Sequence, residues 1–341
     1  MPKKLARRSF LHHGLSLGLA TTLPGLAQAA SQDPPLIVYN GQHKATTLKL
    51  LDAFTAATGI RVESRKGSSI QLANQIIEEG ERSPADVFYS EESPPLAALA
   101  ERGLLAPLED ATLAQVRQDY RDPKGFWSGV SARCRVTAFN TSMIKKGDLP
   151  DSILDMATPA WKGRVAYVPT SGAFQQQIVA ISSIKGRDAA LDWLKGLKRH
   201  GEAYGSNKAA LAAVERGDIA TALINNYYWY NLAQEKGVDK MQSALHFSGQ
   251  GDPGALVTVS GVGVLKTARN AQAAQTLARF LTGAAGQEIL AKAVAEWPMN
   301  PQVKPGFGLQ PFEDLHPPKV NPANLKGEEE ALQLRREAGL A

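Results

Sequence analysis

Three short segments of the 341-residue chain place polar side chains directly after apolar runs. They carry an imidazole at His43, two carboxyls at Glu91 and Glu92, and two phenols at Tyr227 and Tyr228. Oxygen and nitrogen donors without sulfur suit ferric iron better than Cu(I), and no His or Cys cluster typical of zinc is present. Two phenolates and one carboxylate would balance three positive charges, and a neutral imidazole would add a fourth donor. Taken singly, each segment is also explained by helix capping, a solvated helix turn or aromatic packing.

A fourth segment has the features of an anion-binding site. Residues 169–174 lead from an apolar run into a helical pattern, where Ser171 offers a hydroxyl and Gly172 permits close backbone approach. Free N–H groups at a helix start attract anions. Asn207 also opens a helical pattern, and Asn225 ends the apolar run before the tyrosines. Plain N-capping explains the same residues equally well.

The elements that must position these residues alternate between strand and helix. Apolar runs at 36–39, 86–90, 164–168 and 219–224 predict strands, as does the alternating pattern at 60–63. Helical spacing of apolar residues predicts helices between and after them, which favours an α/β fold with a largely parallel sheet. A long strand at 130–139 places Arg133 and Arg135 on one face, and a run at 256–265 returns the chain to the first lobe. We therefore expect two α/β lobes joined by crossing strands, with ligands at the strand ends in the crevice.

The first 29 residues have the pattern of an export signal. Four positive charges precede Phe10, an apolar stretch follows, and Ala27-Gln28-Ala29 provides a cleavage pattern. Arg7-Arg8-Ser9-Phe10-Leu11 resembles a twin-arginine signal, although Sec export stays open. Removing the leader takes four of the net five positive charges and leaves +1. A nearly neutral mature chain without a basic, aromatic-rich cluster argues against nucleic-acid binding, and it is expected in the periplasm.

Several segments of the mature chain resemble the bacterial periplasmic ferric-binding proteins, which are the substrate-binding components of iron ABC importers. The resemblance covers essentially the whole mature chain and is densest in residues 39–44, 83–91, 167–174, 222–229 and 252–257. It implies the two-lobed type II periplasmic binding protein fold with hinge strands. We expect the lobes at 30–132 with 258–309 and at 133–257 with 310–341.

The resemblance also implies the site. At the positions that match the motifs of this family, the resemblance implies that the Fe(III) ligands are His43, Glu91, Tyr227 and Tyr228. The synergistic anion, phosphate in one branch and carbonate in others, is held by Ser171, Gly172, Ala173, Asn207 and Asn225.

One position departs from the phosphate-binding branch. Glu92 stands where that branch has a Gln whose amide donates to phosphate, and a carboxylate there would repel the anion unless it is protonated. Either Glu92 turns away, or it is protonated, or the anion is carbonate held with Arg133 or Arg135, or Glu92 itself binds iron. The implied role is non-enzymatic: a monomer without a membrane span delivers iron to an inner-membrane ABC permease.

Two other functions fit parts of the sequence. A binding protein for an organic or anionic solute, such as thiamine, a polyamine or a phosphonate, would use the aromatic run 227–230 for stacking. It would not need the tyrosine pair together with His43. An exported hydrolase would need a nucleophile, a base and an orienting group, and Ser171-Gly172 lacks the G-x-S-x-G turn. Cys134 lies within a predicted strand, where a buried thiol is expected rather than a nucleophile.

Overall fold

A computed structural model describes residues 34–320 and 327–340 of the chain. The expected export signal at residues 1–29 lies outside the described residues. In this part of the chain, no helix combines the length and the apolar character that crossing a bilayer requires.

Hydrogen bonds join the described strands into one mixed sheet, in the order β2-β1-β3-β10-β5-β8-β6-β7, with β4 on β10 and with β9 and β11 on β5. This sheet has two parts: sheet A contains β1 to β4, β10 and β11, sheet B contains β6 to β9, and β5 takes part in both. The strands are β1 (Leu36–Asn40), β2 (Val62–Lys66), β3 (Val87–Ser90), β4 (Leu105–Ala106), β5 (Trp127–Asn140), β6 (Val165–Tyr167), β7 (Glu202–Ala203), β8 (Thr221–Asn225), β9 (Ser243–His246), β10 (Val257–Leu265) and β11 (Trp297–Pro298).

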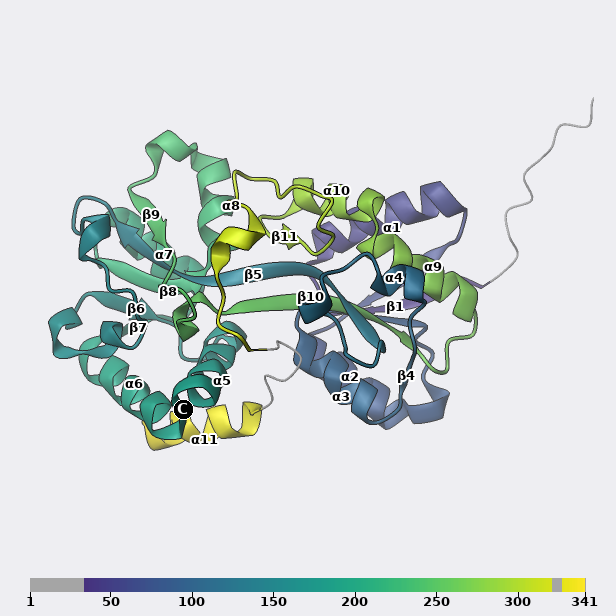
Figure 1. Ribbon diagram of the computed structural model, residues 1–341, viewed down its shortest axis with the longest axis horizontal. Helices are drawn as coiled ribbons and strands as arrows, with labels where there is room; N and C mark the ends of the chain where they lie inside the picture. Colours follow the sequence, from purple (N-terminus) through teal and green to yellow (C-terminus); the bar gives the residue numbers. More distant parts are fainter. Residues whose placement is uncertain (1–33, 321–326, 341) are drawn as a thin grey trace, which may run out of the picture. The chain divides into compact units, whose positions relative to one another are not determined.

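Helices cover the sheet in two groups. Figure 1 shows β5 and β10 running between the group that contains α1, α2, α3, α9 and α10 and the group that contains α5, α6 and α11. The helices are α1 (Lys44–Thr58), α2 (Ser69–Glu79), α3 (Ser93–Glu101), α4 (Asp110–Leu113), α5 (Gly172–Lys185), α6 (Arg187–His200), α7 (Asn207–Arg216), α8 (Asn226–Lys236), α9 (Ala271–Thr282), α10 (Ala284–Ala293) and α11 (Glu328–Glu337). The described residues also form eight 3₁₀ turns: η1 (Gly80–Arg82), η2 (Gln118–Tyr120), η3 (Lys146–Asp148), η4 (Asp155–Ala157), η5 (Pro159–Trp161), η6 (Val238–Lys240), η7 (Pro253–Ala255) and η8 (Phe312–Leu315).

The predicted parallel pairing holds only within each group of strands. β1 pairs in parallel with β2 and β3, and β6 pairs in parallel with β7 and β8. The long strands β5 and β10 are antiparallel to each other and to their other neighbours, because they carry the chain between the groups in opposite directions. The expectation of a largely parallel sheet was therefore wrong for the crossing strands. The run at 256–265 was expected to return the chain to the first lobe, and β10 pairs there with β3.

The changeover between the two sheets falls within β5. Cys134 is the last β5 residue paired with β10, at Val257, and Arg135 is the first paired with β8, at Asn225. One buried apolar cluster follows this strand through both groups, and two further clusters lie under α5 and α6 and under α1 and α9. The crossing strand thus places the ends of β3 and β8 near one another.

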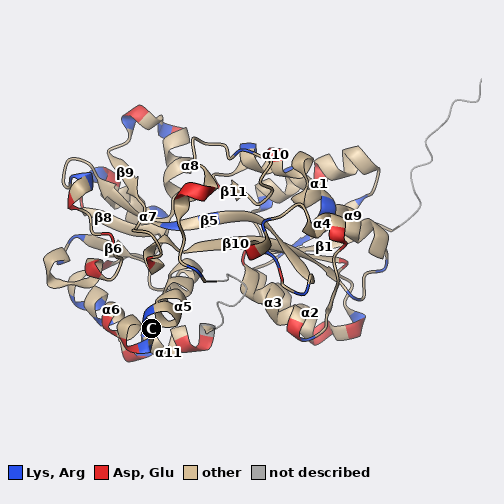
Figure 2. Cartoon of the chain, in the orientation of Figure 1, with Lys and Arg blue, Asp and Glu red and all other residues tan. Residues whose placement is uncertain are grey.

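Charged residues are spread over both groups of helices. Figure 2 shows acidic and basic positions interspersed on α6 and α11, whereas α2 carries only acidic ones. The crossing strand differs, because Arg133 and Arg135 on β5 are only 4% and 3% exposed. Buried guanidinium groups need polar partners, so these two arginines direct attention to the region where the sheets meet.

Candidate functional site

His43 lies at the junction between β1 and α1. The side-chain oxygen of Asn40 accepts hydrogen bonds from the Gln42 N–H at 2.8 Å and from the Thr47 hydroxyl at 3.2 Å, which fix this turn. His43 occupies the N-cap position of α1, but its ring makes no capping hydrogen bond. The His43 imidazole therefore does not cap this helix, and the His43 side chain is 42% exposed.

Glu91 follows β3 and is held through its backbone. Its N–H donates to Ser69 Oγ at 2.9 Å, and its carbonyl oxygen accepts from Arg133. Ser69 opens α2 and packs closely on the turn after β1, because a Cβ atom at Gly41 would lie 2.2 Å from Ser69 Oγ. These contacts lock the His43 and Glu91 segments together, with the Glu91 carboxylate left partly exposed.

Tyr227 and Tyr228 lie in the first turn of α8, which begins immediately after β8. Asn226 pins this junction, since its side-chain oxygen accepts from the Cys134 N–H and its amide donates to the Ala295 carbonyl, both at 2.9 Å. The two phenol rings have centroids 4.4 Å apart and planes tilted by 39°. The direct strand-to-helix junction is the geometry that lets adjacent tyrosines approach one target.

These segments meet at one place. The ring of His43 lies edge-on to that of Tyr227, with centroids 5.8 Å apart, and His43 Nε2 lies 3.9 Å from Glu91 Oε1. Tyr228 completes the group through its contact with Tyr227. The structure thus brings together an imidazole, a carboxylate and two phenols from segments far apart in the sequence.

Burial dominates the electrostatics of this group. It raises the pKa of Tyr227 well above its usual value, and the neighbouring Tyr228 adds to the increase while Arg133 opposes it. Burial also lowers the pKa of Arg135 to about 10, against the attraction of the two tyrosines. Arg135 therefore stays charged at neutral pH, and the Tyr227 phenol keeps its proton until a cation displaces it.

The expected anion seat lies at the start of α5. Ser171 is the N-cap, and its hydroxyl accepts from the Phe174 N–H at 3.2 Å, so its predicted capping role is confirmed. A Cβ atom at Gly172 would meet no heavy atom within 4 Å, which leaves the backbone there open to approach. No contact distinguishes Ala173, which follows in the same turn.

Asn207 and Asn225 do not cap helices with their side chains. Ser206 caps α7, while the amide of Asn207 lies 3.5 Å from the Tyr228 hydroxyl. Asn225 occupies the N-cap position of α8 without a side-chain cap bond, and its oxygen accepts from Arg135 Nη1 at 3.1 Å. Asn207 therefore contacts Tyr228, whereas Asn225 contacts Arg135.

The two residues left open by the sequence have distinct partners. The Glu92 carboxylate accepts a hydrogen bond from the side-chain amide of Gln176, one helical turn beyond Gly172 on α5. Arg135 donates to the neutral oxygens of Asn225, Leu223 and Gln177, at 3.1, 3.0 and 3.3 Å. No carboxylate forms an ion pair with Arg135 among the described residues.

Sequence reasoning missed Ser69, Gln176 and Asn226 as supports of the site. Each acts through a contact with a residue at least 22 positions away, and none stands at a spacing that signals it. The repeated asparagine at 225–226 was the only local hint, because polar side chains that end a buried strand must find partners.

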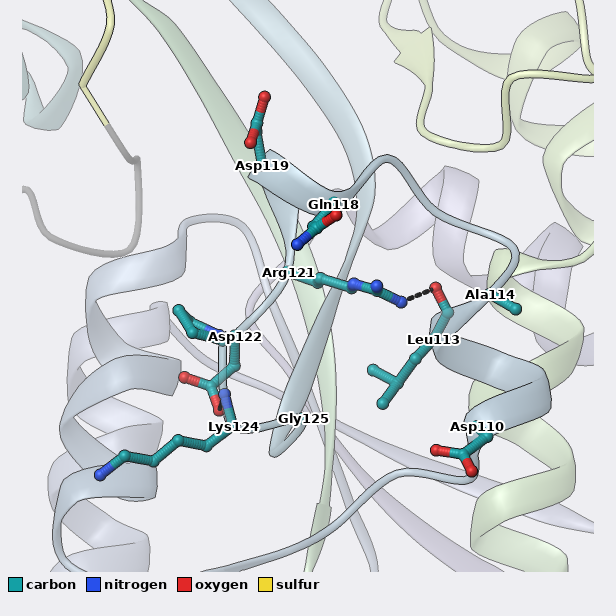
Figure 3. A pocket seen from close by; sticks show the side chains of 10 residues that line it. Asp110, Leu113, Ala114, Gln118, Asp119, Arg121, Asp122, Lys124 and Gly125 are labelled. Carbon is teal, nitrogen blue, oxygen red and sulfur yellow. Dashed lines mark hydrogen bonds between the residues drawn. The ribbon is translucent and has the colours of Figure 1, made fainter.

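A separate cavity of about 590 Å³ lies beside α4 and η2. In Figure 3 the Arg121 guanidinium donates to the Leu113 carbonyl within it. The Asp122 carboxylate accepts from the N–H groups of Lys124 and Phe126, so it serves the local turn. None of the predicted site residues lines this cavity. The described residues contain no group of three or more His, Cys, Asp or Glu side chains that could hold a metal ion without tyrosine.

Comparison with known proteins gives concordant matches. The family model described as bacterial extracellular solute-binding protein matches residues 49–314. The major ferric iron-binding protein of Neisseria gonorrhoeae is 46% identical over 328 residues, which cover 96% of this chain and 97% of that protein. These matches confirm the resemblance that the sequence motifs predicted.

Two solved structures are similar over nearly the same span. The iron-bound structure of HitA from Pseudomonas aeruginosa is 49% identical with a TM-score of 0.84, and the match covers 90% of this chain and all of that one. The structure of IdiA (FutA) from Trichodesmium, in complex with iron and citrate, is 26% identical with a TM-score of 0.78 over 90% and 100% of the two chains. The predicted type II periplasmic binding protein fold with two lobes is thereby confirmed.

Proposed function

Because the chain belongs to the bacterial extracellular solute-binding protein family, we propose that it binds ferric iron in a cleft between its two lobes, where the four predicted ligands meet, and delivers it to an ABC importer. The observation that carries this proposal is the convergence of His43, Glu91, Tyr227 and Tyr228. The iron named in the descriptions of the similar proteins agrees with this donor set. The bound cation would take a neutral imidazole and three anionic oxygens, and the phenolates would match its hard character.

A synergistic anion would complete the coordination. We place it against Ser171, Gly172 and Ala173 at the start of α5, with Asn207 and Asn225 beside it. Arg135 supports this proposal, because its buried charge is satisfied only by neutral oxygens among the described residues. Glu92 lies close by through Gln176 and would repel phosphate, so we propose carbonate in preference.

The wider setting follows from the same family. We infer export to the periplasm through the signal at residues 1–29, with the twin-arginine pair Arg7-Arg8 as its recognition element. The mature monomer would present its closed form to the permease and would carry out no chemical reaction on its cargo. Lobes at 30–132 with 258–309 and at 133–257 with 310–341 would close around β5 and β10, and the switch of pairing after Cys134 supports the first boundary.

Iron binding can be tested by colour. Ferric ion with carbonate or phosphate, added to the purified mature chain, is expected to produce a visible tyrosinate-to-iron charge-transfer band. Tyr227→Phe together with Tyr228→Phe should abolish the band. Tyr230→Phe is the matched control, because Tyr230 packs on Trp229 on the same helix and should leave the band intact. Absence of colour with both anions, or full colour without both phenols, would refute the site.

A further inference from the structure

Behind the cleft, five polar side chains are buried together where β3, β5, β10 and β11 meet. Ser131 and Arg133 are two residues apart on β5 and so face the same side of the sheet. Ser260 pairs with Ser131 across β10, and Tyr89 on β3 pairs with Val262, two residues further along β10. The fifth residue, Glu296, directly precedes β11. Tyr89, Ser131, Ser260 and Glu296 are completely buried, and Arg133 is 4% exposed.

The strand register places Glu296 opposite Arg133. β11 pairs with β5 through Trp297 at Ala132 and Pro298 at Ser131, so the next position on the same antiparallel register brings Glu296 to Arg133. Glu296 Oε2 accepts a hydrogen bond from the Ser131 hydroxyl, which lies 2.7 Å from the Ser260 hydroxyl. Glu296 Oε1 and Arg133 Nη1 make no hydrogen bond within the described residues. The register thus places the two opposite charges on neighbouring strands, with no direct ion pair between them among the described residues.

Arg133 stands between this buried carboxylate and the cleft. Its Nη2 atom contacts the Glu91 carbonyl oxygen and lies 3.9 Å from Glu91 Oε1. Glu91 is partly exposed and would bind the cation, which leaves Glu296 as the fully buried carboxylate opposite Arg133 in the strand register.

We propose that Glu296 is a positioning residue of the cleft site, whose buried carboxylate neutralises Arg133 so that this guanidinium holds Glu91 without repelling a trivalent cation. This inference rests on the proposed function. A guanidinium without a counter-charge, buried a few ångströms from the cation, would oppose binding strongly, because screening by water is weak there. Glu296 thus links the crossing strands to the cargo site.

The test removes the charge while keeping the shape. In the mature chain, Glu296→Gln should weaken ferric ion affinity by about tenfold or more, measured by competition with citrate, while the charge-transfer band persists. The lone guanidinium should also disfavour Fe(III) relative to Fe(II), so the reduction potential of bound iron should shift to a more positive value. A purely structural role for Glu296 would not shift the potential in that direction. Glu313→Gln is the control, because Glu313 pairs with Arg117 at an exposed position.

A second set of variants tests whether Glu296 acts through Arg133. In Arg133→Met the guanidinium that Glu296 is proposed to neutralise is absent, so adding Glu296→Gln should change affinity and potential less than it does beside Arg133. If Glu296→Gln alone does not fold, the added Arg133→Met should restore folding, because it removes the unpaired buried charge. If Glu296→Gln fails to fold both alone and together with Arg133→Met, Glu296 acts only through its hydrogen bonds with the serines. That result would overturn the proposal.

The outcomes separate the two proposals. A wild-type chain without iron colour contradicts the proposed function itself. Wild-type colour together with unchanged affinity and potential in Glu296→Gln overturns only the role of Glu296.

Discussion

Burial determines the protonation of the proposed site residues as much as their side-chain type does. The Tyr227 ring is only 7% exposed, and the pKa of its phenol is raised by that burial and by Tyr228. A buried phenol keeps its proton in the absence of a cation, which prevents an uncompensated negative charge beside Glu91. Only a strongly charged cation can displace this proton, so the environment of Tyr227 favours a trivalent cargo.

This tuning predicts the pH dependence of binding. Tyr227 is protonated in the cargo-free protein between about pH 5 and 8, because its pKa lies well above that range. Iron must release that proton, so each unit of decrease in pH should lower the apparent affinity about tenfold for that group. Competition titrations at several pH values measure the slope of the logarithm of the affinity against pH. They use a chelator whose own affinity for iron is known at each pH. An affinity independent of pH would contradict phenolate binding by Tyr227.

Glu92 predicts a preference between anions. Its carboxylate is bonded to Gln176 on the helix whose start is the proposed anion seat. Glu92→Gln removes a negative charge from this neighbourhood and should strengthen phosphate-dependent iron binding several-fold, with little effect on carbonate-dependent binding. The ratio of iron affinities in the two anions measures the effect. Equal ratios in wild type and variant would show that Glu92 has no influence on the anion.

At the scale of elements, the site depends on how each helix begins. α8 starts without a connecting residue after β8, and Asn226 holds that start by bonds to the Cys134 N–H and the Ala295 carbonyl. Asn226→Ala would leave both buried backbone groups without partners and should lower the free energy of unfolding by about 2–4 kcal/mol. Denaturant unfolding measures this change.

The same helix supplies the control for that prediction. Asn231 lies on the exposed side of α8, so Asn231→Ala should change the unfolding free energy by less than about 0.5 kcal/mol. Equal effects of the two substitutions would show that the junction is not held by Asn226.

The elements also show how far sequence reasoning reached. The runs at 36–39, 86–90 and 219–224 were predicted as strands and correspond to β1, β3 and β8, whose apolar residues are buried on both faces. The second strand was expected at 60–63 but is β2 at Val62–Lys66, an edge strand whose exposed residues carry little pattern. Contacts such as Glu296 with Ser131 could not be predicted, because 165 residues separate the partners and only the register of β11 brings them together.

At the scale of the molecule, β5 and β10 join the two lobes and the proposed ligands come from both sides. His43 and Glu91 follow strands of sheet A, while the tyrosines follow β8 of sheet B. A cation bound to both sets favours the closed arrangement by its differential affinity for that state. We therefore expect the radius of gyration from solution X-ray scattering to decrease when iron and the anion are added.

The variant with both phenols removed provides the comparison for this prediction. Tyr227→Phe with Tyr228→Phe should show no decrease, because the ligands of the second lobe are lost. A decrease of the same size in that variant would mean that closure does not depend on cation binding by the tyrosines.

The most direct measurement of the central claim is the position of iron in a crystal of the mature chain loaded with ferric ion. An anomalous difference map collected near the iron absorption edge should contain one dominant peak, bonded to the His43 imidazole, the Glu91 carboxylate and the phenol oxygens of Tyr227 and Tyr228. A dominant peak at any other place, or one in this cleft without the two phenol oxygens, would contradict the account.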